Sequence, residues 1–266
     1  MQPGIFSEAA RCLALQQPAD KCAAVAGLFA AVNIAEFCWD WDSPIPSVDS
    51  VGRPERPVLI DPAQVPRRRL GNQAGRTALI HAIAHIEFNA INLALDAVCR
   101  FRDMPQEYYR DWLSVAADEA RHFQLLQQRL RELDADYGDH PAHNGLWEMA
   151  EKTTDSCLVR MALVPRVLEA RGLDVTPAMM QRLQSVGDGT TVAILQIILD
   201  EEVGHVAIGS RWFNWCCQQQ GKDPDSTFLQ LLESRYSGAV RGPFNRAARL
   251  TAGFSQREMT ALENQP

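Results

Sequence analysis

The chain has 266 residues, 46% of them apolar, so it can form one large domain, or a domain with an appendage, around a sizeable core. Its net charge of −7 excludes the basic balance of a nucleic-acid-binding protein over the whole chain. No N-terminal stretch combines a basic start with an apolar segment, and no run approaches the roughly 20 apolar residues of a membrane span. We therefore expect a soluble cytoplasmic protein without a membrane partner.

The seven cysteines support the same compartment. Their number is odd, their spacing matches no metal site, and the neighbours Cys216 and Cys217 cannot form a normal structural bridge. A reducing cytoplasm suits such a set of thiols.

The first 72 residues predict a helical hairpin followed by a non-helical segment. Residues 5–40 are apolar and rich in alanine, with a break near Pro18, and Trp39 and Trp41 are interpreted as packing anchors. Six of the fifteen prolines fall between Pro44 and Pro66. Because proline removes a helix hydrogen bond, we expect an extended crossing segment there.

Two long helices follow, and each has charged residues within its apolar face. The first is expected from about Arg76 to Phe101, beginning after Asn72, with Glu87 at the centre of its apolar positions. The second is expected from near Asp103 to before Tyr137, and Glu119 and His122 lie inside its apolar stripe. Buried charges cost several kcal/mol unless they are paired or bound to a metal.

A second helix pair repeats this pattern. Its first helix is expected from Trp147 to before Gly172, kinked at Pro165, with Glu169 continuing the apolar face. A short helix from Thr176 to Gly187 precedes the next long one, which is expected from Asp188–Thr190 to about Gln220. Glu202 and His205 interrupt the apolar stripe of this last helix, and Gly204 and Gly209 suggest a need for space beside it.

The sequence Glu-x-x-His therefore occurs twice, at Glu119–His122 and at Glu202–His205. A spacing of three places both side chains on one helix face, where they can bind one metal ion. One such motif is a weak signal, but each is preceded by a single glutamate at a similar interval, 32 residues from 87 to 119 and 33 from 169 to 202. The chain thus predicts two hairpins that each supply one Glu and one Glu-x-x-His.

This arrangement resembles the ferritin-like di-iron carboxylate superfamily. The strings HAIAHIEFNA, DEARHF, VLEARGLD and LDEEVGHVAIG look like its uncharacterised bacterial branch, the domain of unknown function 455 family, over about residues 70 to 250. The resemblance implies an all-α, ferritin-like four-helix bundle. It also implies two metal ions, with iron as the expected metal and manganese or a mixed Mn/Fe pair as alternatives. The implied ligands are Glu87, Glu119, His122, Glu169, Glu202 and His205, and the carboxylates before each motif, Asp118 and Glu201, would orient a ligand histidine.

On this basis we expect four segments. They are an N-terminal helical appendage (1–42), a Pro-rich connecting segment (43–72), the di-metal bundle (73–220), and a C-terminal helix with a tail that packs on the bundle (221–266). The helix is expected at 226–236, and the basic tail from Arg241 to Arg249 is a candidate lid.

The resemblance favours an oxidase or hydroxylase that activates O2 and acts on an organic substrate, although the sequence identifies neither the substrate nor a catalytic residue. An electron-donor protein and a homodimer are further options. Three alternatives remain. They are a ferroxidase or iron-binding protein, a tRNA-modifying hydroxylase that binds RNA through Arg67–Arg69 and Arg241–Arg249, and a metal-free bundle with ion pairs in its core.

Four histidines lie outside the two motifs. His81 and His85 are interpreted as packing or hydrogen-bonding residues, because His85 points well away from Glu87 on the helix. His140 and His143 lie in a polar loop whose Asp, Pro and Gly residues are typical of turns. Contact with a substrate or a third metal is the alternative for this loop.

Overall fold

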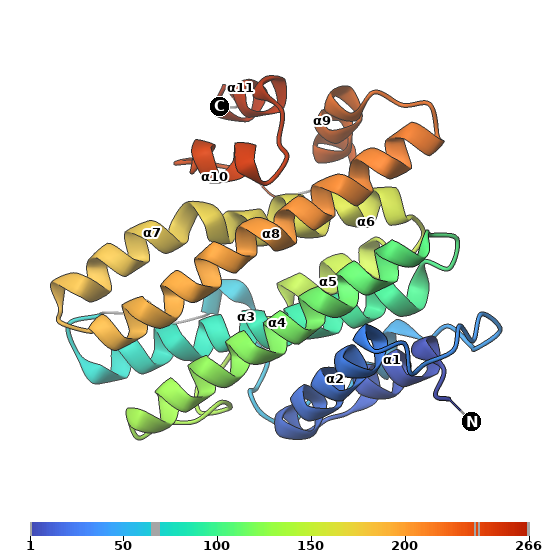
Figure 1. The fold of residues 1–266 in the computed structure, drawn as a ribbon. Helices are drawn as coiled ribbons and strands as arrows, with labels where there is room; N and C mark the ends of the chain where they lie inside the picture. The colour runs from blue at the N-terminus through green and yellow to red at the C-terminus, as the bar shows by residue number, and fades with distance from the viewer. Residues whose placement is uncertain (1, 65–69, 237, 239, 265–266) are drawn as a thin grey trace. The chain divides into compact units, whose positions relative to one another are not determined.

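The structure is a computed structural model that describes residues 2–64, 70–236, 238 and 240–264 (Figure 1). Every regular element in these ranges is a helix, and two isolated β-bridges are the only strand-like pairs there, so the all-α class is confirmed. The chain divides into two compact units, Met1–Glu151 and Lys152–Pro266. The four-helix bundle and the four predicted segments stay predictions, and Arg67–Arg69 lie outside the described residues.

The first unit begins with the predicted hairpin, formed by α1 (Ile5–Ala14) and α2 (Pro18–Asn33). Pro18 occupies the first position of α2, where its missing N–H has no helical acceptor to lose. The rings of Trp39 and Trp41 stack 5.5 Å apart, and both contact Phe6 and Tyr109. The two tryptophans are therefore packing anchors, as the sequence suggests.

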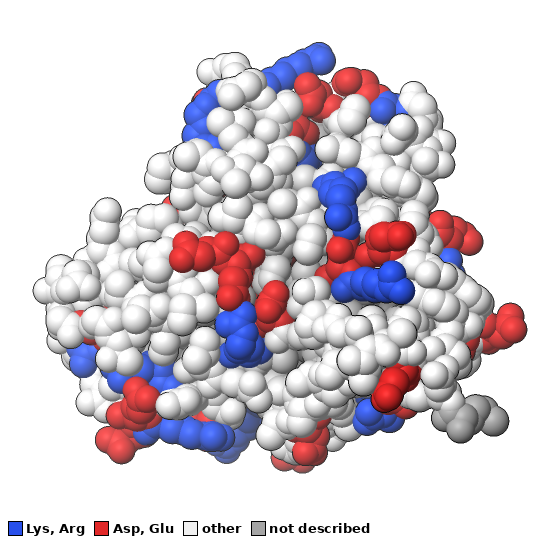
Figure 2. All heavy atoms as spheres, in the orientation of Figure 1, with Lys and Arg blue, Asp and Glu red and all other residues white. Residues whose placement is uncertain are grey.

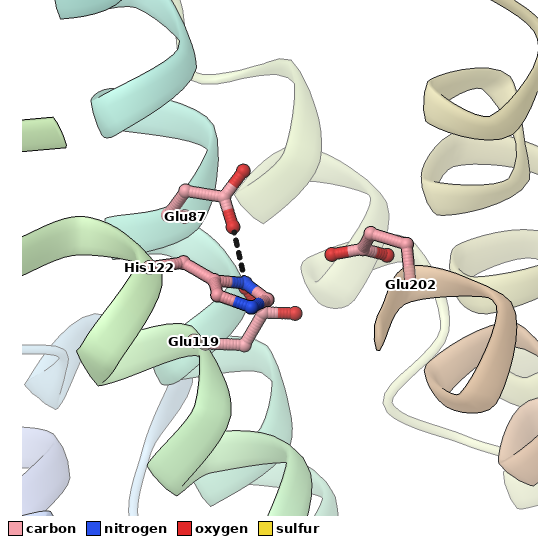
Figure 3. A group of neighbouring side chains, drawn as sticks. All are labelled: Glu87, Glu119, His122 and Glu202. Carbon is pink, nitrogen blue, oxygen red and sulfur yellow. Dashed lines mark hydrogen bonds and ion pairs between the residues drawn. The ribbon is translucent and has the colours of Figure 1, made fainter. Parts of the chain in front are cut away.

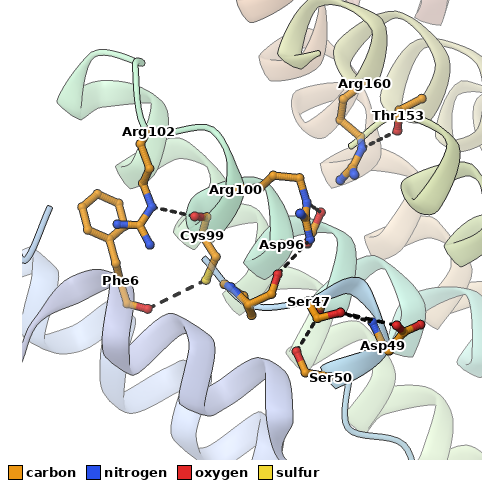
Figure 4. Close-up of polar contacts among 11 residues, drawn as sticks. Phe6, Ser47, Asp49, Ser50, Asp96, Cys99, Arg100, Arg102, Thr153 and Arg160 are labelled. Atoms are coloured by element: carbon orange, nitrogen blue, oxygen red, sulfur yellow. Dashed lines mark hydrogen bonds and ion pairs between the residues drawn. The ribbon is translucent and has the colours of Figure 1, made fainter. Parts of the chain in front are cut away.

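The Pro-rich segment contains no α-helix in its described residues, only the short 3-10 turns η1 (Val48–Ser50) and η2 (Pro62–Gln64). Arg100 attaches the segment to the first unit, because its guanidinium pairs with Asp96 at 2.5 Å and donates to the Pro46 carbonyl at 3.3 Å (Figure 4). Farther along, Ile60 N donates to the Ala142 carbonyl at 2.8 Å. The segment is thus attached to the first unit at two points.

The long hairpin of this unit consists of α3 (Gln73–Arg100) and α4 (Gln106–Glu132), and α5 (Gly145–Lys152) follows. Helix α3 begins directly after Asn72 as expected, and the Asn72 side chain caps it by accepting from Gly75 N at 2.8 Å. The expected start of α4 near Asp103 is wrong, because the helix begins after Pro105. A residue that precedes proline is disfavoured in the helical region, so the position of Met104 before Pro105 disfavours an earlier start.

Helix α3 is long and apolar enough to cross a membrane by length and composition, with a mean hydropathy of 1.4 in its most apolar window. No membrane-spanning segment is expected from the sequence. However, 83% of that window is buried inside the protein, as in the core helix of a soluble fold.

The first unit also buries a lysine. Lys21 on α2 is 0% exposed, and its ammonium donates to the Leu13 carbonyl at 2.7 Å and to Asn92 Oδ1 at 2.6 Å. Burial lowers the pKa of Lys21 from 10.5 to about 7, and the charge of Arg53 acts in the same direction.

The second unit begins with α6 (Cys157–Leu163), a π-helical turn, η3 (Val164–Glu169), and α7 (Ala170–Ser185). The expected single helix from Trp147 to before Gly172 begins near the expected place, in α5, but it is interrupted between Lys152 and Cys157 and does not end before Gly172. Ser156 starts a new helix by accepting from Val159 N at 3.4 Å. Pro165 would clash in a regular α-turn, and the wider π-turn accommodates it, after which the helix continues past Gly172.

Helix α8 (Gly189–Gln219) starts as predicted, with Asp188 accepting from Thr191 N at 3.1 Å. The predicted helix near 226–236 is α9 (Pro224–Arg235), and α10 (Arg246–Thr251) and α11 (Gln256–Glu263) follow. Arg249 of the basic tail is 1% exposed and pairs with Asp174 at 2.8 Å. That arginine is buried within the unit, so it is not a surface cation for RNA.

The two glycines of α8 differ in their surroundings. A Cβ on Gly209 would overlap the ring of Pro165, whereas a Cβ on Gly204 meets nothing within 4 Å. Gly209 therefore allows α8 to approach the π-turn closely, as expected for one of the two glycines.

We predict that Gly209→Ala destabilises the protein by about 1–3 kcal/mol, because the rigid proline ring cannot yield to the new methyl group. Gly204→Ala is the matched control, and it should stabilise the helix by up to about 1 kcal/mol. Thermal and urea unfolding of both variants measures the difference, and equal effects at the two positions would contradict the close contact.

For Lys21 we predict a pH-dependent stability. Its folded pKa, about 7, lies below the unfolded value of 10.5, so the unfolded chain binds more protons between these two pH values. The free energy of unfolding should therefore gain on the order of 4 kcal/mol from this group as pH rises from 7 to 10.5. Subtracting the urea-unfolding profile of Lys21→Met from that of the unmodified protein isolates this contribution, and Lys152→Met, at an exposed position, should leave the profile unchanged.

Candidate metal centre

The first unit contains a buried cluster of two carboxylates and one imidazole. Glu87 comes from α3, and Glu119 and His122 come from α4 (Figure 3). The three residues are 4%, 0% and 0% exposed, and their ligand atoms lie within 4.8 Å of one another. This cluster could hold a metal ion, as the sequence pattern predicts for these three residues.

The geometry around the imidazole suits metal binding. His122 Nδ1 lies 3.2 Å from Glu87 Oε2 and 3.5 Å from Glu119 Oε2. Two neighbouring ligands bound to one ion at about 2.1 Å lie about 3 Å apart, so these atoms need little movement to share an ion. The donors are carboxylate oxygens and one imidazole nitrogen, which are ligands for iron and manganese.

The same contacts set the charge of the cluster. Burial lowers the pKa of His122, but its hydrogen bonds with Glu119 and Glu87 and their negative charges act in the opposite direction, and together they raise it to about 11. The imidazolium thus neutralises part of the carboxylate charge at neutral pH. Imidazole binds a metal in its neutral form, so a bound cation would replace this proton.

Apolar residues surround the cluster on the same helix faces. One helical turn from the ligands lie Ala84 and Ile91 on α3, and Val115, Ala116 and Leu126 on α4, none more than 1% exposed. Charges in such a setting are poorly solvated, so their partners must come from within the protein or from a bound ion.

The second unit carries the other Glu-x-x-His motif, on α8. His205 Nδ1 lies 3.5 Å from Glu202 Oε1, the same separation as in the first motif, and the two side chains are 3% and 12% exposed. Glu202 is also drawn in Figure 3. Both motifs therefore turn the same imidazole nitrogen toward the carboxylate.

Glu169 is the last residue of the π-turn η3 and is half-buried. Pro165 lies four residues before it and contacts α8 at Gly209, which lies four residues after His205. The two helical segments run antiparallel, so one turn forward from Pro165 and one turn back from Gly209 lead to Glu169 and His205 at a similar level. The role of Glu169 as a ligand stays a prediction.

The structure also places the carboxylates predicted to orient the ligand histidines. Asp118 has a side chain that is 36% exposed and pairs with Arg121 at 3.1 Å. Glu201 is half-buried. Their orienting role stays a prediction.

The remaining histidines take part in hydrogen bonds, as expected for His81 and His85. Gly138 N donates to His81 Nε2 at 2.9 Å, and His85 Nδ1 shares a hydrogen bond with the Tyr137 hydroxyl at 2.8 Å. In the loop, His140 Nε2 lies 3.3 Å from Thr77 Oγ1, and Gly145 N donates to His143 Nδ1 at 3.3 Å. These contacts fit the turn interpretation of the two loop histidines.

Comparison with known proteins identifies relatives but no reaction. A family model described as "Protein of unknown function (DUF455)" matches residues 14–260. An uncharacterised protein of Haemophilus influenzae is 44% identical over 227 residues, which cover 83% of this chain and 79% of that protein. No solved structure matches the chain.

We predict that Glu119→Gln lowers the pKa of His122 by about one unit or more in EDTA-treated protein, because the amide removes a negative charge beside the imidazolium. A pH titration followed by NMR of the imidazole nitrogens measures the pKa. Glu107→Gln, on an exposed first-turn residue of the same helix, is the control. An unchanged His122 pKa in Glu119→Gln would contradict the pairing of the two residues.

Proposed function

From the premise that this chain belongs to the DUF455 family, we propose that it is a two-metal carboxylate protein of the ferritin-like type. Each unit supplies one Glu-x-x-His motif and one further glutamate, which gives three ligands for each of two ions. The ions are iron or manganese, and Glu87, Glu119, His122, Glu169, Glu202 and His205 hold them.

The buried cluster of Glu87, Glu119 and His122 is the observation that carries this proposal. Two carboxylates and an imidazole meet where neighbouring positions are fully apolar, and structural packing alone does not require them. The four carboxylates of the proposed ligand set balance the charge of two divalent ions, and the two imidazoles bind in their neutral form.

When bound, the two metals would supply O2 activation, and we propose that the protein is an oxidase or hydroxylase for a small organic substrate. The protein residues hold the ions and control their surroundings. Val115, Ala116 and Leu126 keep water away from the ligands on α4, which favours chemistry on a substrate over reaction with solvent. The same chemistry requires electrons, so a reductant or an electron-donor protein is part of the proposal.

We predict about two iron or manganese ions per chain in protein purified from iron-supplemented cells. The double variant Glu119→Ala/His205→Ala should lose them, because it removes one ligand from each motif. Elemental analysis measures the metal content. Glu107→Ala/His140→Ala changes the same residue types outside the ligand set and should retain the metals. Protein without stoichiometric metal, even after anaerobic reconstitution with ferrous iron, would contradict the proposal.

A second measurement separates the oxygenase from a ferroxidase. Reconstituted protein with a chemical reductant should consume O2 repeatedly without added iron, as an oxygen electrode can record. A ferroxidase would instead consume O2 in proportion to each addition of ferrous iron, and it would accumulate ferric mineral visible by electron microscopy. That outcome would keep the metal site and overturn the hydroxylase function.

A further inference from the structure

The first unit contains a half-buried arginine, Arg53, on which the charge of Glu151 acts but two of whose guanidinium nitrogens have no hydrogen-bond partner in the part of the chain that the structure describes. The Nε and Nη2 atoms of Arg53, in the Pro-rich segment, are both inaccessible to solvent and have no hydrogen-bond partner among the described residues. The guanidinium lies over the ring of Trp147, with its carbon 5.5 Å from the ring centroid. A desolvated charge without a hydrogen-bond acceptor is unfavourable, so this position favours a partner that comes from outside the chain.

The two free atoms define the kind of partner. Nε–H and Nη2–H lie on the same edge of the guanidinium plane and point in parallel, so they bind two oxygens of one oxyanion. The ring of Trp147 restrains the plane of the group, which orients this edge before a ligand arrives.

A fully buried cation, Lys21, lies close to Arg53. The charge of Arg53 acts on Lys21, whose ammonium donates to Leu13 and Asn92. Asn92 is 0% exposed, and its Nδ2 is also a donor without an acceptor. Two cations and an amide donor without an acceptor thus lie in one region of the first unit.

Gly52 fixes the place of Arg53 in this neighbourhood. Gly52 N donates to the Leu13 carbonyl at 2.9 Å, the same oxygen that accepts from Lys21. A Cβ on Gly52 would overlap the backbone of Ala14, so only glycine allows this close approach. The backbone next to Arg53 is therefore held beside the lysine.

Helix α3 contributes further polar side chains to this region. His85, Asn89 and Asn92 follow spacings of four and three, so they share one helix face. Glu87 lies about 200° around the helix from His85, so the metal ligand belongs to a different face. Asn89 Oδ1 and, next to His143, Asn144 Oδ1 are buried acceptors without a donor.

A surface pocket of about 410 Å³ opens beside this region. Its lining includes Pro54, next to Arg53, and Pro18, one turn before Lys21. It also includes Tyr137, whose hydroxyl is hydrogen-bonded to His85. The pocket is thus lined by residues next to those that hold the buried groups.

We propose that Arg53 anchors a second binding site, distinct from the metal centre, for a small ligand that carries a carboxylate or phosphate group. The oxyanion binds the Nε and Nη2 edge of Arg53 and is further attracted by Lys21 and the Asn92 amide. Asn89 and Asn144 accept hydrogen bonds from hydroxyl or amino groups of the same ligand.

The test is isothermal titration calorimetry on the full-length, EDTA-treated protein at low ionic strength. Sodium phosphate and sodium acetate are the probes, and sodium chloride at matched ionic strength is the reference. We expect one saturable site for phosphate, acetate or both. Phosphate alone identifies a phosphate ligand, and acetate alone identifies a carboxylate.

Arg53→Gln should weaken binding by about tenfold or more, because it removes both the charge and the paired donors. Arg53→Lys keeps the charge but not the paired edge, and it should bind with intermediate affinity, which provides a second test if the glutamine variant folds poorly. Arg11→Gln, on an exposed arginine, and Glu119→Gln, in the metal cluster, should bind like the unmodified protein.

Two results would overturn the proposal. One is a response to phosphate and acetate no greater than that to chloride, which would mean that buried water satisfies Arg53. The other is unchanged affinity in a folded Arg53→Gln variant. Both results are independent of metal content, so they leave the proposed two-metal function untouched.

Discussion

The cost of burying charge is the constraint on which this protein depends. Glu119 and His122 are completely buried on an apolar helix face, and Glu87 faces them from the neighbouring helix. Each group alone would destabilise the fold by several kcal/mol. Their mutual contacts reduce that cost, and they bring three ligand atoms together at metal-binding distances. The same contacts thus limit the cost of burying these groups and prepare the proposed chemistry.

The protein meets this constraint differently for its buried cations. In the second unit, Arg166 pairs with Glu258 at 2.7 Å and lies over the rings of Phe213, Phe228 and Phe254. Arg249 likewise pairs with Asp174. These pairs attach α11 to the π-turn η3 and α10 to α7, so their role is structural. In the first unit the charge of Glu151 acts on Arg53, but no carboxylate of the described residues accepts from Arg53 Nε or Nη2, and Lys21 donates to Leu13 and Asn92 instead of an acid. This difference is the reason to expect a ligand beside them.

Backbone geometry also determines the position of the residues near the Glu202–His205 motif. Pro165 is unfavourable in a regular α-turn, and the π-turn that contains it ends at Glu169. The absence of a side chain on Gly209 then lets α8 pack against that proline. A local irregularity in one helix and a glycine in the next therefore set the position of a proposed ligand together. Such irregularities are frequent at functional sites, which agrees with the role proposed for Glu169.

The sequence alone determined the all-α class, the approximate course of α1 to α4 and of α8 and α9, and the grouping of Glu87 with Glu119 and His122. Helical periodicity and capping residues are local signals, so a stripe of apolar positions identifies which side chains turn inward. The same periodicity shows where a carboxylate stands among apolar positions, which marks it as a candidate ligand. The family followed from the same residues, because the two repeated motifs and their flanking strings are specific as a set.

Only the tertiary structure decided how α6, η3 and α7 follow one another, why Gly209 differs from Gly204, and that Lys21 and two guanidinium nitrogens of Arg53 are buried. Nothing in the local sequence distinguishes Lys21 from an exposed lysine at the start of a helix. Its burial depends on the distant residues Asn92 and Gly52, and that of Arg53 depends on Trp147. The physical reason is that hydrogen bonds and burial are set by contacts between residues far apart in the chain, whereas periodicity reports only on neighbours.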